Sequence, residues 1–459
     1  MENSRKLHIV MFPWLAMGHL IPFLKFSNIL AQKGHKISFI STPKNLQKLS
    51  KVPSSSVSLI SFALPSIPGL PPFAETTTDV PYTKQQLLKK AFDLLESPLT
   101  TFLESVKPDW VIYDYASHWL PSIASKIGIS SAFFSLFTAA TLSFTGPPPS
   151  LMMNGDSRLA AEDFASVPKW VPFETNVKFH IHEVTKYVEK TEADETGPND
   201  GVRFGFSAGK ADVIIIRSSP EFESEWFDLY GKMSEKRIIP VGFLPPREVE
   251  EEDSDEEEWD NIRLWLDKKE AKSVVYVALG TEAALTQEEV NELALGLEKS
   301  RSPFFWVLKN PPGSTRNAME MLPDGFEQRV KDHGVIYNGW VPQVKILRHE
   351  AVGVFLTHCG WNSIIEGLSF NRILILFPVL NDQGLNARLL EEKKLGLEIP
   401  RNELDGTFTS DSVAELVRKA KADGLEDLAK EMRDLFRDRD ENNQIVEQVV
   451  HYLEENRIS

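Results

Sequence analysis

Residues 340–383 place polar and aromatic side chains at intervals that suit a phosphorylated ligand. An apolar strand, Val352–Thr357, is expected to run directly into the sequence HCGWNS at 358–363, where a helical pattern begins. Backbone N–H groups and the positive end of a helix dipole meet at such a junction and form an anion site. Asn362 and Ser363 either cap that helix or hydrogen-bond phosphate oxygens. The segment therefore predicts a place for a diphosphate.

Side chains on either side of this junction suit the other parts of a nucleotide sugar. Trp340 offers a flat face for a base. Glu366, on the same helix face as Asn362, suits two ribose hydroxyls. Asp382 and Gln383 combine a carboxylate and an amide that suit sugar hydroxyls. Base, ribose, diphosphate and sugar thus each have a partner, in chain order.

A second pair of reactive side chains lies in the first half of the chain. His19 ends the run FPWLAMGH, after the first predicted strand and before a helix marked by Pro22. An imidazole there either takes a proton from a hydroxyl or serves as a cap or packed polar group. Asp114 follows the strand Trp110–Tyr113, and it either caps a helix or hydrogen-bonds a ring nitrogen of His19. His118 is expected to form a pocket wall or to lie at the surface.

Composition excludes several other classes of protein. A chain of 459 residues favours two domains, and 42% hydrophobic with 25% charged residues is typical of a soluble globular protein. The net charge of −16 argues against a nucleic-acid partner. The acidic run Glu248–Asp260 is expected to be a solvated linker. The single cysteine, Cys359, excludes an intrachain disulfide, and no signal peptide or membrane anchor is visible, so a cytoplasmic monomer is expected.

Short apolar runs alternate with amphipathic helical patterns, which predicts an α/β fold with two doubly wound parallel sheets. The strands expected in the first half are Leu7–Phe12, Lys36–Ser41, Val57–Ala63, Trp110–Tyr113, Ala132–Phe137 and Val213–Arg217. Those in the second half are Ser273–Leu279, Phe304–Leu308, Val335–Asn338, Gly353–Thr357 and Ile373–Phe377. The boundary between the halves is expected within residues 245–262.

Residues 340–383 resemble the signature box of the plant UDP-dependent secondary-product glycosyltransferases. The resemblance rests on the length of the box, HCGWNS, the position of Glu366 and the closing Asp-Gln. It extends over essentially the whole chain. FPWLAMGH, PDWVIYDYASHWLPSIA and VVYVALGTEA resemble the branch of this family that contains many enzymes adding a sugar to an existing glycoside.

The resemblance implies the GT-B fold, in which two Rossmann-like domains face each other across a cleft. Residues 1–244 would bind the acceptor, 245–262 would form the acidic linker, and 263–440 would bind the UDP-sugar. The final helix, 441–459, would pack back on the first domain. The implied reaction is an inverting transfer that requires neither metal nor cofactor. In accord with this, no DxD between strands, HExxH or cysteine cluster is present.

The resemblance also assigns roles to individual residues. His19 would be the general base and Asp114 its partner. The donor would be bound by Thr138, Gly280, Thr281, Trp340, Val341, Gln343, His358, Gly360, Trp361, Asn362, Ser363, Glu366, Asp382 and Gln383. An apolar, aromatic acceptor pocket is expected from Trp14, Met17, Tyr115, His118 and Phe137. Glu282 departs from the small residues common in the family and has no assigned role.

The expected donor is UDP-glucose, because Trp361, Asp382 and Gln383 resemble the pattern of glucose users. UDP-rhamnose is the alternative, and Asn381 and Ala278 differ from residues usual in well-known glucosyltransferases. A flavonoid, phenolic, terpenoid or glycoside acceptor is expected, with its identity and regiospecificity open.

Two other classes of protein compete with a transferase. A nicotinamide oxidoreductase would also have Rossmann-like halves, but Gly18 stands alone where GxGxxG is required. A non-catalytic UDP-sugar-binding protein would be expected to lack His19 or Asp114, and both are present.

Overall fold

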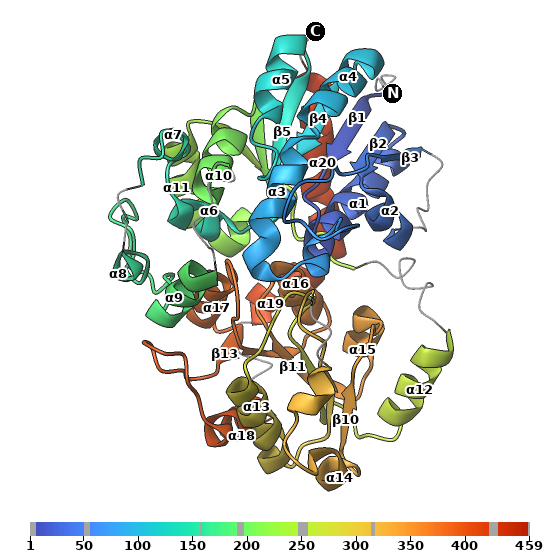
Figure 1. Ribbon diagram of the computed structural model, residues 1–459, viewed down its shortest axis with the longest axis vertical. Coiled ribbons are helices and arrows are strands. Elements are labelled where there is room, and N and C mark those ends of the chain that lie inside the picture. Colours follow the sequence, from blue (N-terminus) through green and yellow to red (C-terminus); the bar gives the residue numbers. More distant parts are fainter. Residues whose placement is uncertain are drawn as a thin grey trace. The chain divides into compact units, whose positions relative to one another are not determined.

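The computed structural model describes residues 6–49, 56–156, 158, 160–190, 197–246, 256–313, 317–421 and 430–457. The chain divides into two compact units. The first unit comprises Met1–Leu159, Lys190–Leu244 and Asp440–Ser459; the second comprises Ala160–Glu189 and Pro245–Arg439. Each unit contains one parallel β-sheet with helices packed around it (Figure 1). The predicted α/β class with two Rossmann-like sheets is confirmed.

The first unit is built on a seven-stranded sheet of order β3-β2-β1-β4-β5-β6-β7. Its strands are β1 (His8–Phe12), β2 (Lys36–Ser41), β3 (Val57–Ser61), β4 (Trp110–Tyr113), β5 (Ser130–Ser135), β6 (Val213–Ile216) and β7 (Arg237–Pro240). Its helices are α1 (Met17–Gln32), α2 (Pro43–Lys48), η1 (Thr77–Asp79), η2 (Tyr82–Lys84), α3 (Gln85–Asp93), α4 (Glu96–Val106), α5 (Leu120–Ile127), α6 (Ala139–Thr145), α7 (Pro148–Met152), α10 (Asp200–Gly209), α11 (Pro220–Ser234) and α20 (Arg439–Glu455). Strands β4 and β6 are apolar throughout because both faces of a parallel sheet are covered.

The winding of this sheet reverses between β1 and β4. Strand β1 pairs in parallel with β2 on one side and with β4 on the other. The connections that follow these two strands therefore leave in opposite directions, which opens a space at the carboxyl ends of the strands. His19 follows β1 and Asp114 follows β4, so both residues lie at this reversal.

The last helix of the chain, α20, belongs to the first unit (Figure 1). It contributes four side chains to the core beneath the sheet, namely Val446, Val449, Val450 and Leu453. The indole Nε1 of Trp110 in β4 donates to the carbonyl of Leu453 at 2.9 Å. The Asn442 side chain accepts from the Phe243 amide at 2.8 Å. Helix α20 is thus an integral part of the first unit.

The second unit is built on a six-stranded sheet of order β10-β9-β8-β11-β12-β13. Its strands are β8 (Val274–Ala278), β9 (Phe304–Val307), β10 (Gly334–Tyr337), β11 (Val352–Thr357), β12 (Ile373–Leu376) and β13 (Gly396–Glu398). Its helices are α8 (Ala161–Phe164), α9 (Ile181–Lys190), α12 (Glu256–Leu266), α13 (Gln287–Ser300), η4 (Ala318–Met321), α14 (Phe326–Val330), α15 (Gln343–Arg348), α16 (Trp361–Ser369), α17 (Gln383–Glu392), α18 (Ser410–Ala420) and α19 (Lys430–Arg437). The winding reverses between β8 and β11, which Gly280 and His358 follow.

Two features of the fold differ from the expectations drawn from sequence. The edge strands β7 and β13 were not predicted, because both are short and lie at sheet edges. The predicted linker, 245–262, is also wrong in its last part. Residues 247–255 lie outside the described residues, but α12 begins at Glu256, so the end of the acidic run is helical.

Residues 160–189 join the second unit, whereas sequence reasoning had placed them in the first. The Lys186 ammonium pairs with the Glu289 carboxylate at 3.1 Å. The Thr175 hydroxyl donates to the Glu392 carboxylate at 2.9 Å. These polar contacts between distant parts of the chain account for the difference. Within the described parts of the chain, no helix is long and apolar enough to cross a membrane.

Candidate active site and donor-binding residues

The predicted pair of His19 and Asp114 is present in the first unit. His19 lies in the first turn of α1, and its Nδ1 is 2.6 Å from Oδ2 of Asp114. The Asp114 side chain is fully buried, whereas the imidazole is partly exposed. With the carboxylate accepting the Nδ1 proton, the lone pair of the imidazole lies on Nε2.

The backbone fixes the Asp114 carboxylate in this orientation. Oδ2 also accepts from the Trp14 amide at 3.2 Å, and Oδ1 accepts from the Tyr115 amide at 2.7 Å. Three donors thus hold the two oxygens and fix the orientation of the Asp114 side chain toward His19.

Aromatic rings surround the exposed side of His19. The ring centroids of Tyr115 and Phe137 lie 5.9 Å and 5.8 Å from the His19 centroid. Phe204, which sequence reasoning did not identify, stacks on Tyr115 at 4.8 Å and packs edge-on to Phe137 at 5.1 Å. Trp14 is buried, with its ring 6.4 Å from that of Tyr115. This arrangement suits an apolar or aromatic ligand beside the base.

Two other predicted pocket residues have different surroundings. Met17 is partly buried and packs against the core of the first unit. His118 belongs to a buried ionic network, in which its Nδ1 lies 3.1 Å from an Arg203 nitrogen. Arg203 is paired with Asp93 at 2.6 Å. Burial and the Arg203 cation lower the pKa of His118, which favours a structural role for it.

Thr138 was assigned to the donor by resemblance, and the structure shows it capping a helix. It is the N-cap of α6, and its buried hydroxyl accepts from the Thr141 amide. This is the ordinary task of threonine at a helix start.

The predicted strand-to-helix junction in the second unit is confirmed at the end of β11. Helix α16 begins at Trp361 with Gly360 as its N-cap. Asn362 and Ser363 lie within the first turn, so neither is the N-cap residue, which was one of their two predicted roles. The first turn of a helix directs backbone N–H groups and the positive end of the dipole toward its N-terminus, which suits an anion.

The imidazole of His358 lies close to two glycines, Gly280 and Gly360. A Cβ at Gly280 would be 2.7 Å from Nε2 of His358, and one at Gly360 would be 2.5 Å from the same atom. Gly280 also has a φ of +78°, which favours glycine. Any other residue at either position would collide with the imidazole. The exposed Thr281 continues the Gly280 turn.

The surroundings of His358 keep its imidazole neutral. Burial lowers the pKa of His358 to about 4, the Ala278 carbonyl opposes this shift, and the Lys309 cation adds to it. Sequence reasoning missed Lys309, although it follows β9 just as Gly280 follows β8. The pKa of Lys309 is itself lowered by burial.

Hydrogen bonds through Gln343 orient Glu366, the carboxylate that is predicted to bind the ribose. Gln343 donates to Glu366 at 2.7 Å and to the Ser363 hydroxyl at 3.3 Å. It accepts from the Tyr276 hydroxyl at 3.2 Å. The Trp340 side chain is 58% exposed, so its face is open for a base to stack.

The predicted sugar residues are held by contacts around α17. The carbonyl oxygen of Gln383 accepts from the amides of Val379 and Leu380, each at 2.9 Å. Gln383 therefore has only its amide nitrogen to offer a sugar. Asn386, which sequence reasoning missed, donates at 2.8 Å to Asp382 and at 3.1 Å to the carbonyl of Cys359. Asn386 thus links Asp382 to the backbone at Cys359.

Three residues of the box are buried in packing. The Trp361 indole lies edge-on to Phe436 at 6.1 Å, and Val341 is 7% exposed. Only the backbone of these two is expected to serve a donor. Cys359 is buried and has a φ of +67°. Burial raises the pKa of the Cys359 thiol, consistent with the predicted packing role.

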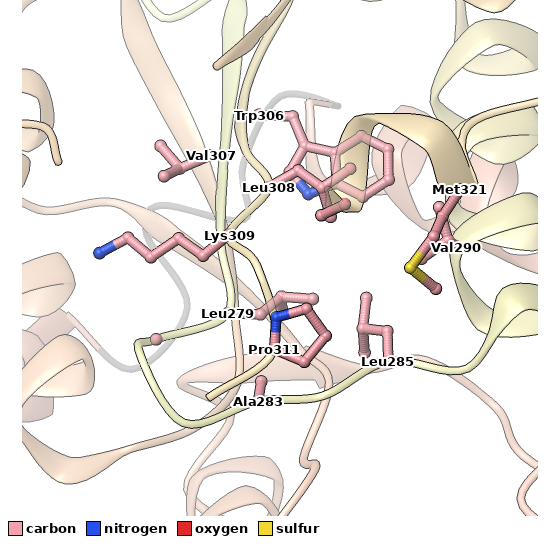
Figure 2. Close-up of a pocket in the computed structure, with 12 residues that line it drawn as sticks. Leu279, Ala283, Leu285, Val290, Trp306, Val307, Leu308, Lys309, Pro311 and Met321 are labelled. Atoms are coloured by element: carbon pink, nitrogen blue, oxygen red, sulfur yellow. The ribbon is translucent and has the colours of Figure 1, made fainter. Parts of the chain in front are cut away.

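A pocket lies beside the Gly280 turn (Figure 2). Apolar side chains line most of it, among them Leu285, Trp306 and Met321. Lys309 extends away from these apolar groups. Gly280 is the only predicted donor residue among the described lining residues, so this pocket is not the centre of the donor site.

Comparisons with known proteins agree with this geometry. Residues 255–422 match the family model described as UDP-glucoronosyl and UDP-glucosyl transferase. UDP-glycosyltransferase 91C1 of Arabidopsis thaliana is 57% identical, over 98% of this chain and 97% of its own length. Soyasaponin III rhamnosyltransferase of Glycine max is 38% identical, over 100% and 97%. The structure of Arabidopsis thaliana UGT89C1 with UDP-L-rhamnose has a TM-score of 0.78 at 24% identity, covers 98% of this chain and 100% of its own, and shares the fold.

The relatives match this chain over nearly its entire length. The chain therefore belongs to the plant UDP-glycosyltransferase family, whose members are enzymes that transfer a sugar from a UDP-sugar.

Proposed function

We propose that this protein transfers glucose from UDP-glucose to a hydroxyl of a small apolar or aromatic acceptor. The acceptor is a flavonoid, a phenolic, a terpenoid or a glycoside of one of these. The contact that carries the proposal is the 2.6 Å hydrogen bond between His19 and the buried Asp114. It supplies a general base among aromatic rings, which a protein that only binds UDP-sugars does not need.

The proposed reaction is a single displacement at the anomeric carbon. Nε2 of His19 takes the proton of the acceptor hydroxyl, and Asp114 stabilises the imidazolium. The acceptor oxygen forms its bond to the anomeric carbon as the bond to the UDP oxygen breaks. UDP leaves with the electron pair, and the anomeric configuration is inverted. General-base help of this kind contributes on the order of 10²–10⁴-fold in rate.

The charge of the departing UDP falls on groups of the second unit. The candidates are the N-terminal end of α16, the imidazole of His358 and the Lys309 cation. Stabilising a leaving group with fixed dipoles and cations lowers the barrier without a metal ion. Trp340 would stack on uracil, and Glu366, oriented by Gln343, would accept from the ribose.

Sugar choice is assigned to Asp382 and Gln383. Gln383 would donate to a sugar hydroxyl through its amide nitrogen, and Asp382 would accept from another. UDP-rhamnose is the second candidate donor, because one relative is named a rhamnosyltransferase and a structural neighbour contains UDP-L-rhamnose. L-Rhamnose lacks the 6-hydroxyl of glucose and belongs to the L series, so the two donors present differently placed hydroxyl groups.

A screen of donors against acceptors tests the whole proposal. UDP-glucose and UDP-rhamnose are each paired with flavonoids, phenolics, terpenoids and their monoglucosides, and products are identified by mass. We expect hexose addition. We also predict that the protein is a cytoplasmic monomer, and the single cysteine is in keeping with the cytoplasmic location. If only rhamnose were added, UDP-rhamnose would replace UDP-glucose as the proposed donor. If none of the pairs gave a product, the proposed activity would be contradicted.

The first prediction concerns the base. His19→Ala is expected to abolish transfer and to leave UDP affinity within a few-fold, because the base acts on the acceptor proton. Asp114→Asn is expected to lose less activity with acidic phenols than with alcohols, because such hydroxyls need less base. Initial rates and calorimetry with UDP measure both effects. His349→Gln, at a surface ion pair with Asp267, is the matched control. If the activity of His19→Ala were within tenfold of that of the parent, the assignment of His19 as the general base would be contradicted.

The second prediction separates the two ends of the donor. Trp340→Ala is expected to weaken UDP binding by about 1–3 kcal/mol, the contribution of a lost base stack. Asp382→Ala is expected to leave UDP affinity nearly unchanged but to reduce turnover with UDP-glucose. Calorimetry with UDP and initial rates distinguish these outcomes. If both variants weakened UDP equally, the assigned order of base and sugar along the chain would be wrong.

The third prediction is a pH effect at His358. Its pKa of about 4 leaves the imidazole neutral near pH 7, and a bound diphosphate raises the pKa of the group. Binding of UDP-glucose is therefore expected to take up a proton and to tighten as the pH falls toward the pKa of about 4 of the unliganded protein. UDP-glucose is used because it has no terminal phosphate that titrates in this range. Calorimetry in buffers of different ionisation enthalpy measures the uptake, which His358→Gln should remove; equal uptake in that variant would exclude His358.

The fourth prediction concerns metal removal. Transfer activity is expected to be unchanged after EDTA treatment and dialysis, because protein groups meet the leaving-group charge. Initial rates before and after treatment, with and without added Mg²⁺, test this. Loss of activity that Mg²⁺ restores would show that the protein groups are insufficient.

A further inference from the structure

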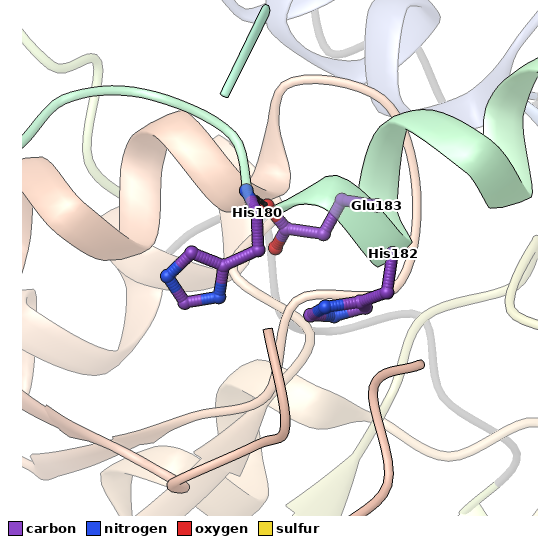
Figure 3. A group of neighbouring side chains, drawn as sticks. All are labelled: His180, His182 and Glu183. Atoms are coloured by element: carbon purple, nitrogen blue, oxygen red, sulfur yellow. Dashed lines mark hydrogen bonds between the residues drawn. The ribbon is translucent and has the colours of Figure 1, made fainter. Parts of the chain in front are cut away.

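A cluster of side chains in the second unit is not used by the proposed reaction. His180, His182 and Glu183 lie at and just before the start of α9, and their rings and carboxylate come together in Figure 3. One nitrogen or oxygen from each residue lies within 4.8 Å of the other two. None of the three is among the residues predicted to bind acceptor or donor.

Three buried atoms in this cluster have no hydrogen-bond partner among the described residues. They are Nδ1 of His180, Nε2 of His182 and Oε1 of Glu183. The His182 residue is only 6% exposed. Folded proteins rarely leave buried polar atoms unpaired, so three together indicate a missing ligand.

The surrounding contacts present these atoms as electron-pair donors. Nδ1 of His182 lies 3.3 Å from the carbonyl of Glu403, so it carries the proton and leaves the lone pair on Nε2. Oε2 of Glu183 accepts from the His180 amide at 2.8 Å and from Arg388. Oε1 then remains for another ligand. Outer hydrogen bonds of this kind orient the ligands of metal ions in proteins.

The charges nearby allow a cation. Arg388 is paired with Glu183 and, at 2.6 Å, with Glu398. Arg401 is paired with Glu289 at 2.8 Å. Arg388 is thus paired with two carboxylates, whereas Arg401 and Lys186 share one, Glu289.

A water molecule is the competing occupant of this space, and the absence of metal binding would favour it.

We propose that His180, His182 and Glu183 bind one divalent transition-metal ion of the zinc type. Two imidazoles and one carboxylate are a ligand set that zinc accepts, with a water molecule in the fourth position. Bond lengths of about 2.0–2.1 Å require the ligand atoms to lie about 3.3 Å apart, so small side-chain rotations close the site.

The proposed site is close to the part of the chain that begins with α17. A Cβ at Gly384 would be 2.7 Å from Oε1 of Glu183, and one at Gly406 would be 2.6 Å from the His182 ring. The site is therefore enclosed by residues 384–406 as well as by its own segment. Metal binding at this site is separate from transfer, so the expected activity after EDTA treatment is unaffected.

The test measures metal binding by the full chain. The protein is stripped with a chelator, dialysed and titrated with ZnCl₂ by calorimetry, and Co²⁺ binding is followed by visible absorption. We expect one ion per chain, with at least tenfold weaker binding in His182→Gln and in His180→Gln. The control is His451→Gln, which removes a surface pair with Glu455 at 3.1 Å and is expected to bind normally.

Three results would overturn the proposal. They are the absence of Zn²⁺ and Co²⁺ binding by the parent chain, equal binding in the His182 and His180 variants, and loss of binding in the His451 variant alone. Thermal denaturation of each metal-free variant shows whether it folds. If His182→Gln fails to fold, the less buried His180→Gln decides the role of the cluster, and the parent titration is unaffected.

Discussion

The reversal of winding in each parallel sheet is the constraint on which the chemistry of this protein depends. Strands β1 and β4, and likewise β8 and β11, are neighbours from which the chain continues in opposite directions. The connections diverge, and the carboxyl ends of the strands stay accessible. His19 and Asp114 follow one such pair, and Gly280 and His358 follow the other. At each reversal, two residues from segments that are distant in sequence are thus brought together at the ends of neighbouring strands.

Much of the fold was predictable because the central strands are continuous apolar runs. Runs such as Val213–Ile216 are buried on both faces and stand out in the sequence. The edge strands β7 and β13 are short and partly exposed, so their pattern is weak. The placement of residues 160–189 was not predictable. It rests on contacts such as Lys186 with Glu289, and no local pattern links such distant residues.

The features of the candidate site also divide into those that could be predicted from the sequence and those that could not. The His19–Asp114 pair and the α16 junction could be predicted because each depends on a residue type at a strand end. The remaining details depend on hydrogen-bond partners that the fold alone brings together. The two backbone amides that occupy the carbonyl of Gln383 are one case, and the bridge from Asn386 to Cys359 is another. Lys309 could have been found from the sequence, because it follows β9, the neighbour of β8.

The two histidines at the reversals show how one residue type serves opposite tasks. His19 has a buried carboxylate at 2.6 Å, so a proton taken from an acceptor finds a compensating charge. His358 has burial and a cation around it, and its pKa falls to about 4. It gains a proton favourably only when an anion is bound. Had the two environments been exchanged, the base would lack a partner for its proton, and a carboxylate would repel the diphosphate. The division of labour therefore follows from the charge placed beside each imidazole, since the ring itself is the same.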